Sequence, residues 1–75
     1  MQFVQLVNDI IGVWKQENLL INIDEINKRV KAGSTGSEIN ELILEYFLIL
    51  KSKNDISYQL VKNEIDKAIR QGPDN

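Results

Sequence analysis

The alternation of apolar and polar residues along the chain predicts four amphipathic helices. In residues 2–17 the apolar side chains recur at intervals of three and four, the spacing that places them on one side of a helix. The same period recurs in residues 23–32, 35–52 and 57–71, and short polar or apolar connections separate these segments. We therefore predict an all-α chain, folded as a compact four-helix bundle in which the third helix, about residues 35–52, is central.

The third predicted helix is apolar on nearly all of its surface. Its main stripe consists of Ile39, Leu42, Ile43, Tyr46, Phe47 and Leu50. Leu44 and Leu48 lie on nearly the opposite side of the same helix. Such a helix must be covered on more than one side, by its own chain or by a partner. Two interpretations of Leu44 and Leu48 therefore stay open: they belong to the core, or they form the seam of a homodimer.

Polar residues mark the expected helix starts. Asn22 followed by Glu25 has the spacing of a capping box, and Thr35 followed by Glu38 repeats that spacing before the third helix. Ser57 is the expected cap of the fourth helix. These positions predict where each helix begins.

Other residues suggest how the helices pack and end. Gly12 lies inside the first helix, where glycine costs about 1 kcal/mol relative to alanine, so we expect another helix to approach closely there. Trp14 is expected to anchor the core, and Gly33 is typical of the residue that follows a helix. Cations in the last turns of the second helix suit the negative end of its dipole: Lys28, Arg29 and Lys31.

The composition is that of one small globular domain. The chain has 75 residues, of which 43% are hydrophobic and 27% charged, close to ordinary globular proteins. This length is near the lower size at which a single core suffices. We expect one helical domain over residues 1–72, because Gly72-Pro73 is a strong helix stop, and a frayed tail over residues 73–75.

Several function classes are disfavoured by the composition. The chain contains neither cysteine nor histidine, which excludes disulfides, thiolate metal sites and histidine-based acid–base chemistry. No apolar run reaches the roughly 18 residues of a membrane span, and no basic segment precedes an apolar one at the start, so a cytoplasmic location is expected. The formal charge of −2, from 11 acids and 9 bases, argues against a nucleic-acid binder.

Three carboxylates recur along the third predicted helix. Glu38, Glu41 and Glu45 are spaced i, i+3 and i+7. Such a row is able to supply an acid–base pair or a magnesium site, to meet a basic partner surface, or simply to form the solvated edge of an apolar helix. A bundle of this size has little room for a substrate pocket of about 300 Å³, so we expect neither an enzyme nor a cofactor.

The segment Gly33-Ser34-Thr35-Gly36-Ser37 is the only glycine- and hydroxyl-rich stretch, and it either caps the third helix or binds an anion there. A helix-turn-helix is disfavoured because the following helix presents apolar and acidic residues rather than basic ones. A serine at the start of a central helix resembles acyl and peptidyl carrier proteins, which implies a phosphopantetheine arm on Ser37. Their Asp-Ser-Leu signature is replaced here by Gly36-Ser37-Glu38.

Residues 33–39, Gly-Ser-Thr-Gly-Ser-Glu-Ile, lead into a long apolar helix and are followed by the stripe from Leu60 to Ile69. This arrangement, over about residues 31–69, resembles small helical bacterial immunity proteins. The resemblance implies stoichiometric binding of a toxin domain without a cofactor. From the composition we expect no metal site and neither nucleic acid nor a membrane as a partner. Residues able to meet a basic toxin surface are Glu38, Glu41 and Glu45, with Tyr46 or Tyr58 as aromatic anchors. The alternative is a self-associating helical protein that uses Leu44 and Leu48.

Overall fold

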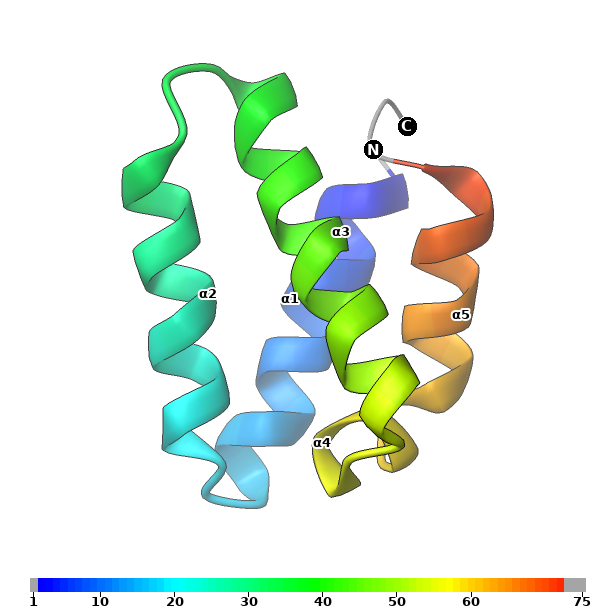
Figure 1. Cartoon of the computed structure of the whole chain (residues 1–75). Helices are drawn as coiled ribbons and strands as arrows, with labels where there is room; N and C mark the ends of the chain where they lie inside the picture. The colour runs from blue at the N-terminus through cyan, green and yellow to red at the C-terminus, as the bar shows by residue number, and fades with distance from the viewer. Residues whose placement is uncertain (1, 73–75) are drawn as a thin grey trace.

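The computed structural model describes residues 2–72, and within that range the chain is helical with short connections and no β-strand (Figure 1). The helices are α1 (Gln2–Gln16), α2 (Leu20–Ala32), α3 (Gly36–Lys53), α4 (Ile56–Gln59) and α5 (Lys62–Gln71). The prediction of an all-α chain is confirmed. None of these helices is long and apolar enough to cross a membrane. The predicted frayed tail, residues 73–75, lies outside the described residues.

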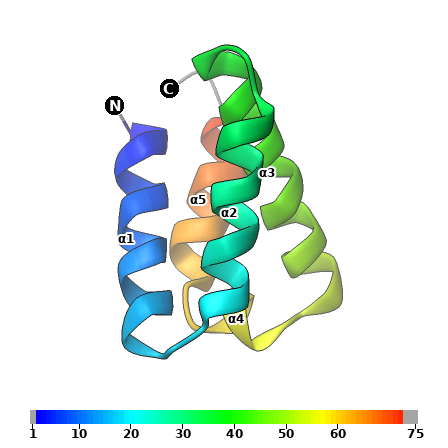
Figure 2. The same cartoon turned by 90° about the vertical axis from the view of Figure 1, so that its left-hand side faces the viewer.

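The helices are arranged so that α5 returns beside α1. α2 packs against both α1 and α3, and α3 packs against α5. Figure 1 shows α1 running obliquely behind α3: it meets α2 at the lower turn and diverges from it toward the upper end. In Figure 2, turned by 90°, α2 stands in front of the space between α1 and α3.

α1, rather than α3, supplies the largest share of the core in the described part of the chain. The buried apolar side chains of α1 are Phe3, Leu6, Val7, Ile10 and Trp14. Those of α3 are Ile43, Phe47 and Leu50. The remaining members of this cluster are Ile26, Tyr58, Val61, Ile65 and Ala68. α3 contacts α2, α4 and α5, but it stays open to solvent at Leu48, which is 47% exposed.

Trp14 anchors the core as predicted. Its side chain is fully buried, and its indole Nε1 donates a hydrogen bond to the carbonyl oxygen of Ser57 at 2.9 Å. Its ring meets those of Tyr46 and Phe47 edge-on, with both pairs of centroids 6.4 Å apart. One side chain of α1 thus joins α3 and α4.

The expected single fourth helix is instead two helices, α4 and α5. α4 begins after Asp55, whose carboxylate accepts hydrogen bonds from the backbone N–H of Ser57 at 3.2 Å and from its hydroxyl at 2.6 Å. Asp55 is therefore the cap of α4. Ser57, the predicted cap, lies within the helix and is fully buried. The helix is interrupted at Val61, where φ is −128° and the buried side chain packs into the core. The interruption places α4 across the lower end of the bundle, where its backbone receives Trp14 (Figure 1).

The predicted start of the second helix was wrong. α2 begins at Leu20, and Asn22 lies within its first turn rather than capping it. The Asn22 amide Nδ2 donates instead to the hydroxyl oxygen of Tyr46 at 2.8 Å. Helix formation extends to Leu20 because Leu19 packs against the core and its carbonyl oxygen accepts from Ile23 N–H.

The expected role of Gly12 was also wrong. A Cβ atom added to Gly12 would meet nothing within 4 Å, so no other helix among residues 2–72 approaches there. Close approach occurs at Gly33, where an added Cβ would lie 2.5 Å from Cγ1 of Ile39 and 3.0 Å from its backbone nitrogen. Gly33 is in an extended conformation, with φ −82° and ψ 145°, so it is required by contact with α3 and not by a left-handed turn.

Candidate functional site

Arg29 is the centre of the junction between α2 and α3. Its Nε donates to Glu25 Oε2 at 2.9 Å, and its Nη1 donates both to the Leu42 carbonyl oxygen at 2.8 Å and to Glu45 Oε1 at 2.9 Å. The guanidinium carbon lies 5.3 Å from the centroid of the Tyr46 ring. The guanidinium therefore donates hydrogen bonds through its nitrogens and also makes a cation–π contact with the ring of Tyr46.

The surroundings of Arg29 favour its charged form. Burial alone would lower the pKa of Arg29, but the hydrogen bonds to Glu25 and Glu45 and the charges of these carboxylates together raise it above its ordinary value. Besides standing in the last turn of α2, as predicted, Arg29 offsets part of the negative charge on α3. Sequence reasoning missed this pair because the partners lie 16 positions apart.

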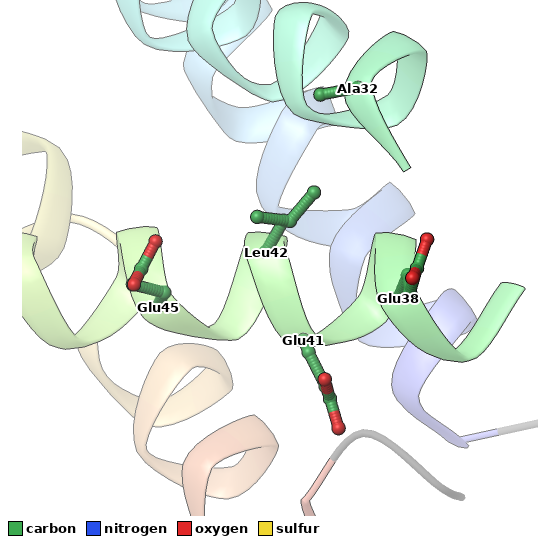
Figure 3. Close-up of a pocket in the computed structure, with 5 residues that line it drawn as sticks. All are labelled: Ala32, Glu38, Glu41, Leu42 and Glu45. Atoms are coloured by element: carbon green, nitrogen blue, oxygen red, sulfur yellow. The ribbon is translucent and has the colours of Figure 1, made fainter. Parts of the chain in front are cut away.

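A shallow hollow of about 400 Å³ lies beside this junction (Figure 3). Its lining residues are Ala32, Glu38, Glu41, Leu42 and Glu45. Figure 3 shows Glu38 and Glu45 extending toward the side of α2, whereas Glu41 points away from it. The structure therefore brings the three predicted carboxylates to one hollow without making them converge on one point. In the described part of the chain no group of three or more acids is placed to hold a metal ion.

Glu38 also caps the start of α3. Its backbone N–H donates to the Thr35 hydroxyl at 3.1 Å, and its own carboxylate accepts from the backbone N–H of Ser34 at 2.7 Å. The predicted Thr35–Glu38 cap is confirmed, with the return bond made to Ser34 rather than to Thr35. Because the Glu38 carboxylate already occupies the Ser34 N–H, its negative charge repels any anion that would bind at this loop. Ser37 is exposed in the first turn of α3.

The two tyrosines differ in accessibility. Tyr46 is half-buried, and burial is the main cause that raises the pKa of its hydroxyl, although the bond from Asn22 acts in the opposite direction. Tyr58 is only 5% exposed, and its hydroxyl donates to Asp66 Oδ1 at 2.7 Å. A buried ring committed to Asp66 is not available to a partner, so only Tyr46 stays in the candidate surface.

Leu44 and Leu48 differ in how deeply their side chains are buried. Leu44 is half-buried and packs against the core, whereas Leu48 is 47% exposed, next to Ile49 at 38%. Of the two residues, Leu48 is the one that a second molecule is able to cover.

A second concavity, which we call the apolar groove, was not predicted. Its volume is about 230 Å³, and it lies among α1, α2 and α3. Its lining residues are Val4, Val7, Asn8, Ile11, Ile26, Asn27, Val30, Ile39, Asn40 and Ile43. Val30, which lines the groove from α2, is 42% exposed. The sequence signals were Val4 and Ile11, two apolar residues of the first helix that lie outside the series formed by its buried side chains.

Comparison with known proteins identifies no related protein. No protein-family model matches the chain, and neither a curated protein nor a solved structure matches it.

Proposed function

We propose that this chain is a non-catalytic protein-binding module whose partner presents a basic surface. The observation that carries the proposal is the hollow bordered by Glu38, Glu41 and Glu45. In its most concrete form the module is an immunity protein that binds and neutralises a bacterial toxin domain, as the resemblance of residues 31–69 implies.

The charge distribution supports a basic partner. The charge of Glu45 is offset by Arg29, whereas neither Glu38 nor Glu41 takes part in an ion pair within the described residues. These two carboxylates therefore supply the negative potential of the hollow. Like-signed, uncompensated charges on an interface attract an oppositely charged partner and raise its association rate.

The apolar lining supports a long cationic side chain in particular. Ala32 and Leu42 contribute the apolar part of the hollow, with the carboxylates around them. Arginine and lysine bury an aliphatic stem along apolar surface while their charged ends stay with polar groups. Tyr46, half-buried at the same α2–α3 junction with its ring beside the Arg29 guanidinium, is the aromatic side chain of the candidate surface.

The experiment is capture of partners by the tagged protein from lysate of its source organism, compared with a Glu38→Gln/Glu41→Gln variant. We expect a stoichiometric partner with a basic surface, retained by the parent protein and lost by the variant or at high salt. The matched control is Glu17→Gln/Asp24→Asn, which removes the same charge from exposed positions outside the hollow. Equal capture by all three proteins would contradict the proposed surface.

Self-association is a second candidate function, favoured by the exposure of Leu48 and Ile49 on α3. In this version two copies cover each other's α3. Sedimentation of the protein alone distinguishes the versions: a mass of 8.6 kDa contradicts self-association, whereas twice that mass, abolished by Leu48→Asp, supports it.

A further inference from the structure

We propose that Arg29 is an internal competitor for the acidic hollow: it holds Glu45 in the free protein, and a cationic side chain of the partner takes its place. This regulation rests on the proposed function and determines how much of the acidic surface a partner meets. Arg29 Nη1 donates to Glu45 Oε1 at 2.9 Å, and Glu45 is one of the residues that line the hollow. The chain itself therefore supplies a guanidinium to a carboxylate of the partner-binding surface.

Of the two carboxylates that Arg29 binds, Glu45 is the one that a partner is able to reach. The Glu45 side chain is 64% exposed, whereas that of Glu25 is 33% exposed. Glu45 lines the hollow and extends toward the side of α2 (Figure 3), whereas Glu25 does not line it. An ion pair with so exposed a member is weak, because water screens the attraction between the two charges. Exchange of one cation for another at Glu45 therefore costs little free energy.

Arg29 keeps most of its contacts when Glu45 is released. Its Nε still donates to Glu25, so the positive charge keeps a carboxylate partner. Its Nη1 still donates to the Leu42 carbonyl oxygen, and its face stays beside the Tyr46 ring. A guanidinium carries several N–H donors in one fixed plane, so the loss of one acceptor leaves the side chain held in place. Release of Glu45 therefore does not require α2 and α3 to separate.

Exchange changes the charge of the surface that a partner meets. While Arg29 holds Glu45, the uncompensated charge of the hollow comes from Glu38 and Glu41, neither of which makes an ion pair within the described residues. Once Glu45 is released, Arg29 is compensated by Glu25, and three free carboxylates border the hollow. Displacing Arg29 is offset only by a partner whose cations reach all three carboxylates. Arg29 therefore favours partners with clustered cations over those with scattered positive charge.

The test measures binding of an acetylated hexa-arginine peptide at an ionic strength of about 0.01 M, where charges interact over about 30 Å. Hexacitrulline, which has nearly the same shape without the charge, is the control peptide. We expect Arg29→Gln to tighten binding of hexa-arginine by about two- to fivefold, the range that corresponds to an exposed ion pair. Lys28→Gln is the matched variant, because it removes the same charge from an exposed neighbour without an ion pair in the described residues. It should tighten binding less than Arg29→Gln does.

A double variant separates the release of Glu45 from the general effect of charge. In the Glu45→Gln background, Arg29→Gln should tighten binding no more than Lys28→Gln does, because the carboxylate that Arg29 covers is absent. The two substitutions are therefore expected to be non-additive.

A second measurement uses the parent protein, so it stands even if circular dichroism shows that Arg29→Gln does not fold. The carbon NMR signals of the glutamate carboxylates are followed during titration with hexa-arginine. The Glu45 signal should shift until saturation, because its cation is exchanged. The Glu25 signal should stay, because Arg29 keeps this partner.

Four outcomes would overturn the proposed competition. They are equal binding of hexa-arginine and hexacitrulline, equal tightening by Arg29→Gln with and without Glu45, a Glu45 signal that is unchanged at saturation, and failure of both the parent protein and Arg29→Gln to bind hexa-arginine. The acidic hollow is tested separately by Glu38→Gln/Glu41→Gln. If that variant binds hexa-arginine as the parent protein does, the hollow is contradicted, while the coupling of Arg29 to Glu45 is still measured by the double variant.

Discussion

Two glycines have opposite relations to their surroundings, and this difference predicts opposite effects of the same substitution. Gly12→Ala introduces a methyl group into open space in the middle of α1, so the gain in helix propensity should stabilise the fold by about 0.5–1 kcal/mol. Gly33→Ala places a methyl group 2.5 Å from Cγ1 of Ile39 and 3.0 Å from its backbone nitrogen, so the side chain of Ile39 must shift and the fold should lose about 1–3 kcal/mol.

The measurement is chemical denaturation of both variants beside the parent protein. Gly36→Ala is a useful comparison, because an added Cβ there also meets nothing within 4 Å, at the first residue of α3. A destabilised Gly12→Ala variant would show that another element, absent from the packing described above, approaches α1 at this position.

For single residues, the sequence identifies unusual positions, but it does not reveal which partner each of them binds. Thr35 and Glu38 were predictable because a cap joins residues three apart. Asn22 has the same local signature, yet its amide bonds to Tyr46, 24 positions away. A local pattern carries no information on distant partners, which is why one cap was confirmed and the other was wrong.

Between elements, Arg29 is the principal polar connection of α2 to α3. Arg29→Met removes its bond to the Leu42 carbonyl and its contacts with two carboxylates, at a site where the Arg29 side chain is only 18% exposed. We expect a loss of about 1.5–3 kcal/mol in the free energy of unfolding. Arg29→Lys should recover only a minor part, because a single ammonium cannot reproduce the planar set of donors.

Glu25→Gln is the matched control for Arg29 in the same denaturation experiment. Glu25 makes one of these contacts, between positions four apart on α2, and such pairs contribute only about 0.3–0.5 kcal/mol. A loss as large for Glu25→Gln as for Arg29→Met would contradict the assignment of Arg29 to the α2–α3 junction.

A second connection between elements makes stability depend on pH. Asp66 on α5 accepts a hydrogen bond from Tyr58 of α4 at 2.7 Å and pairs with Lys51 of α3 at 3.1 Å. The hydrogen bond from Tyr58 and the interaction with Lys51 lower the pKa of Asp66, although burial opposes them. The sequence instead suggests a pair of Asp66 with Arg70 on the same helix, because only local partners are visible in it.

The sign of the pH effect follows from this lowered pKa. The folded state favours ionised Asp66, so its contribution is complete above the ordinary aspartate pKa of about 3.9 and is lost as the pH falls through the lower pKa of the folded state. Asp66→Asn should lower the free energy of unfolding by about 1–2 kcal/mol at neutral pH. The variant should also lose less stability than the parent on acidification.

The check is the free energy of unfolding from urea titrations at several pH values between neutrality and acid. Asp24→Asn, at an exposed position of α2, is the control for removal of a charge. Parallel pH profiles for Asp66→Asn and the parent protein would contradict the role assigned to Asp66.

At the scale of the whole molecule, the helical period established the fold class but not the division of the last helix. Tyr58, Val61, Ile65 and Ala68 are spaced as on one continuous helix, and all are buried. The chain nevertheless breaks at Val61, and α4 meets Trp14 through a hydrogen bond between positions 43 apart, which a local period cannot reveal. The acidic row was visible in the sequence, whereas the apolar groove was not, because it results from the divergence of α1 and α2.

Trp14 connects three elements, so it should report on the molecule as a single cooperative unit. Its ring contacts Phe47 of α3, and its indole donates to the Ser57 carbonyl of α4. We expect its fluorescence and the helical circular dichroism signal to change together in urea, at the same midpoint and with the same slope. Trp14→Phe keeps most of the apolar contact but leaves the buried carbonyl without this donor. It should therefore cost about 1–3 kcal/mol, more than Tyr46→Phe, whose hydroxyl bonds only to Asn22 in a half-buried position. A fluorescence transition that precedes the loss of helix would show that α4 and its contact with α1 open separately, and the bundle would then consist of two units of unequal stability.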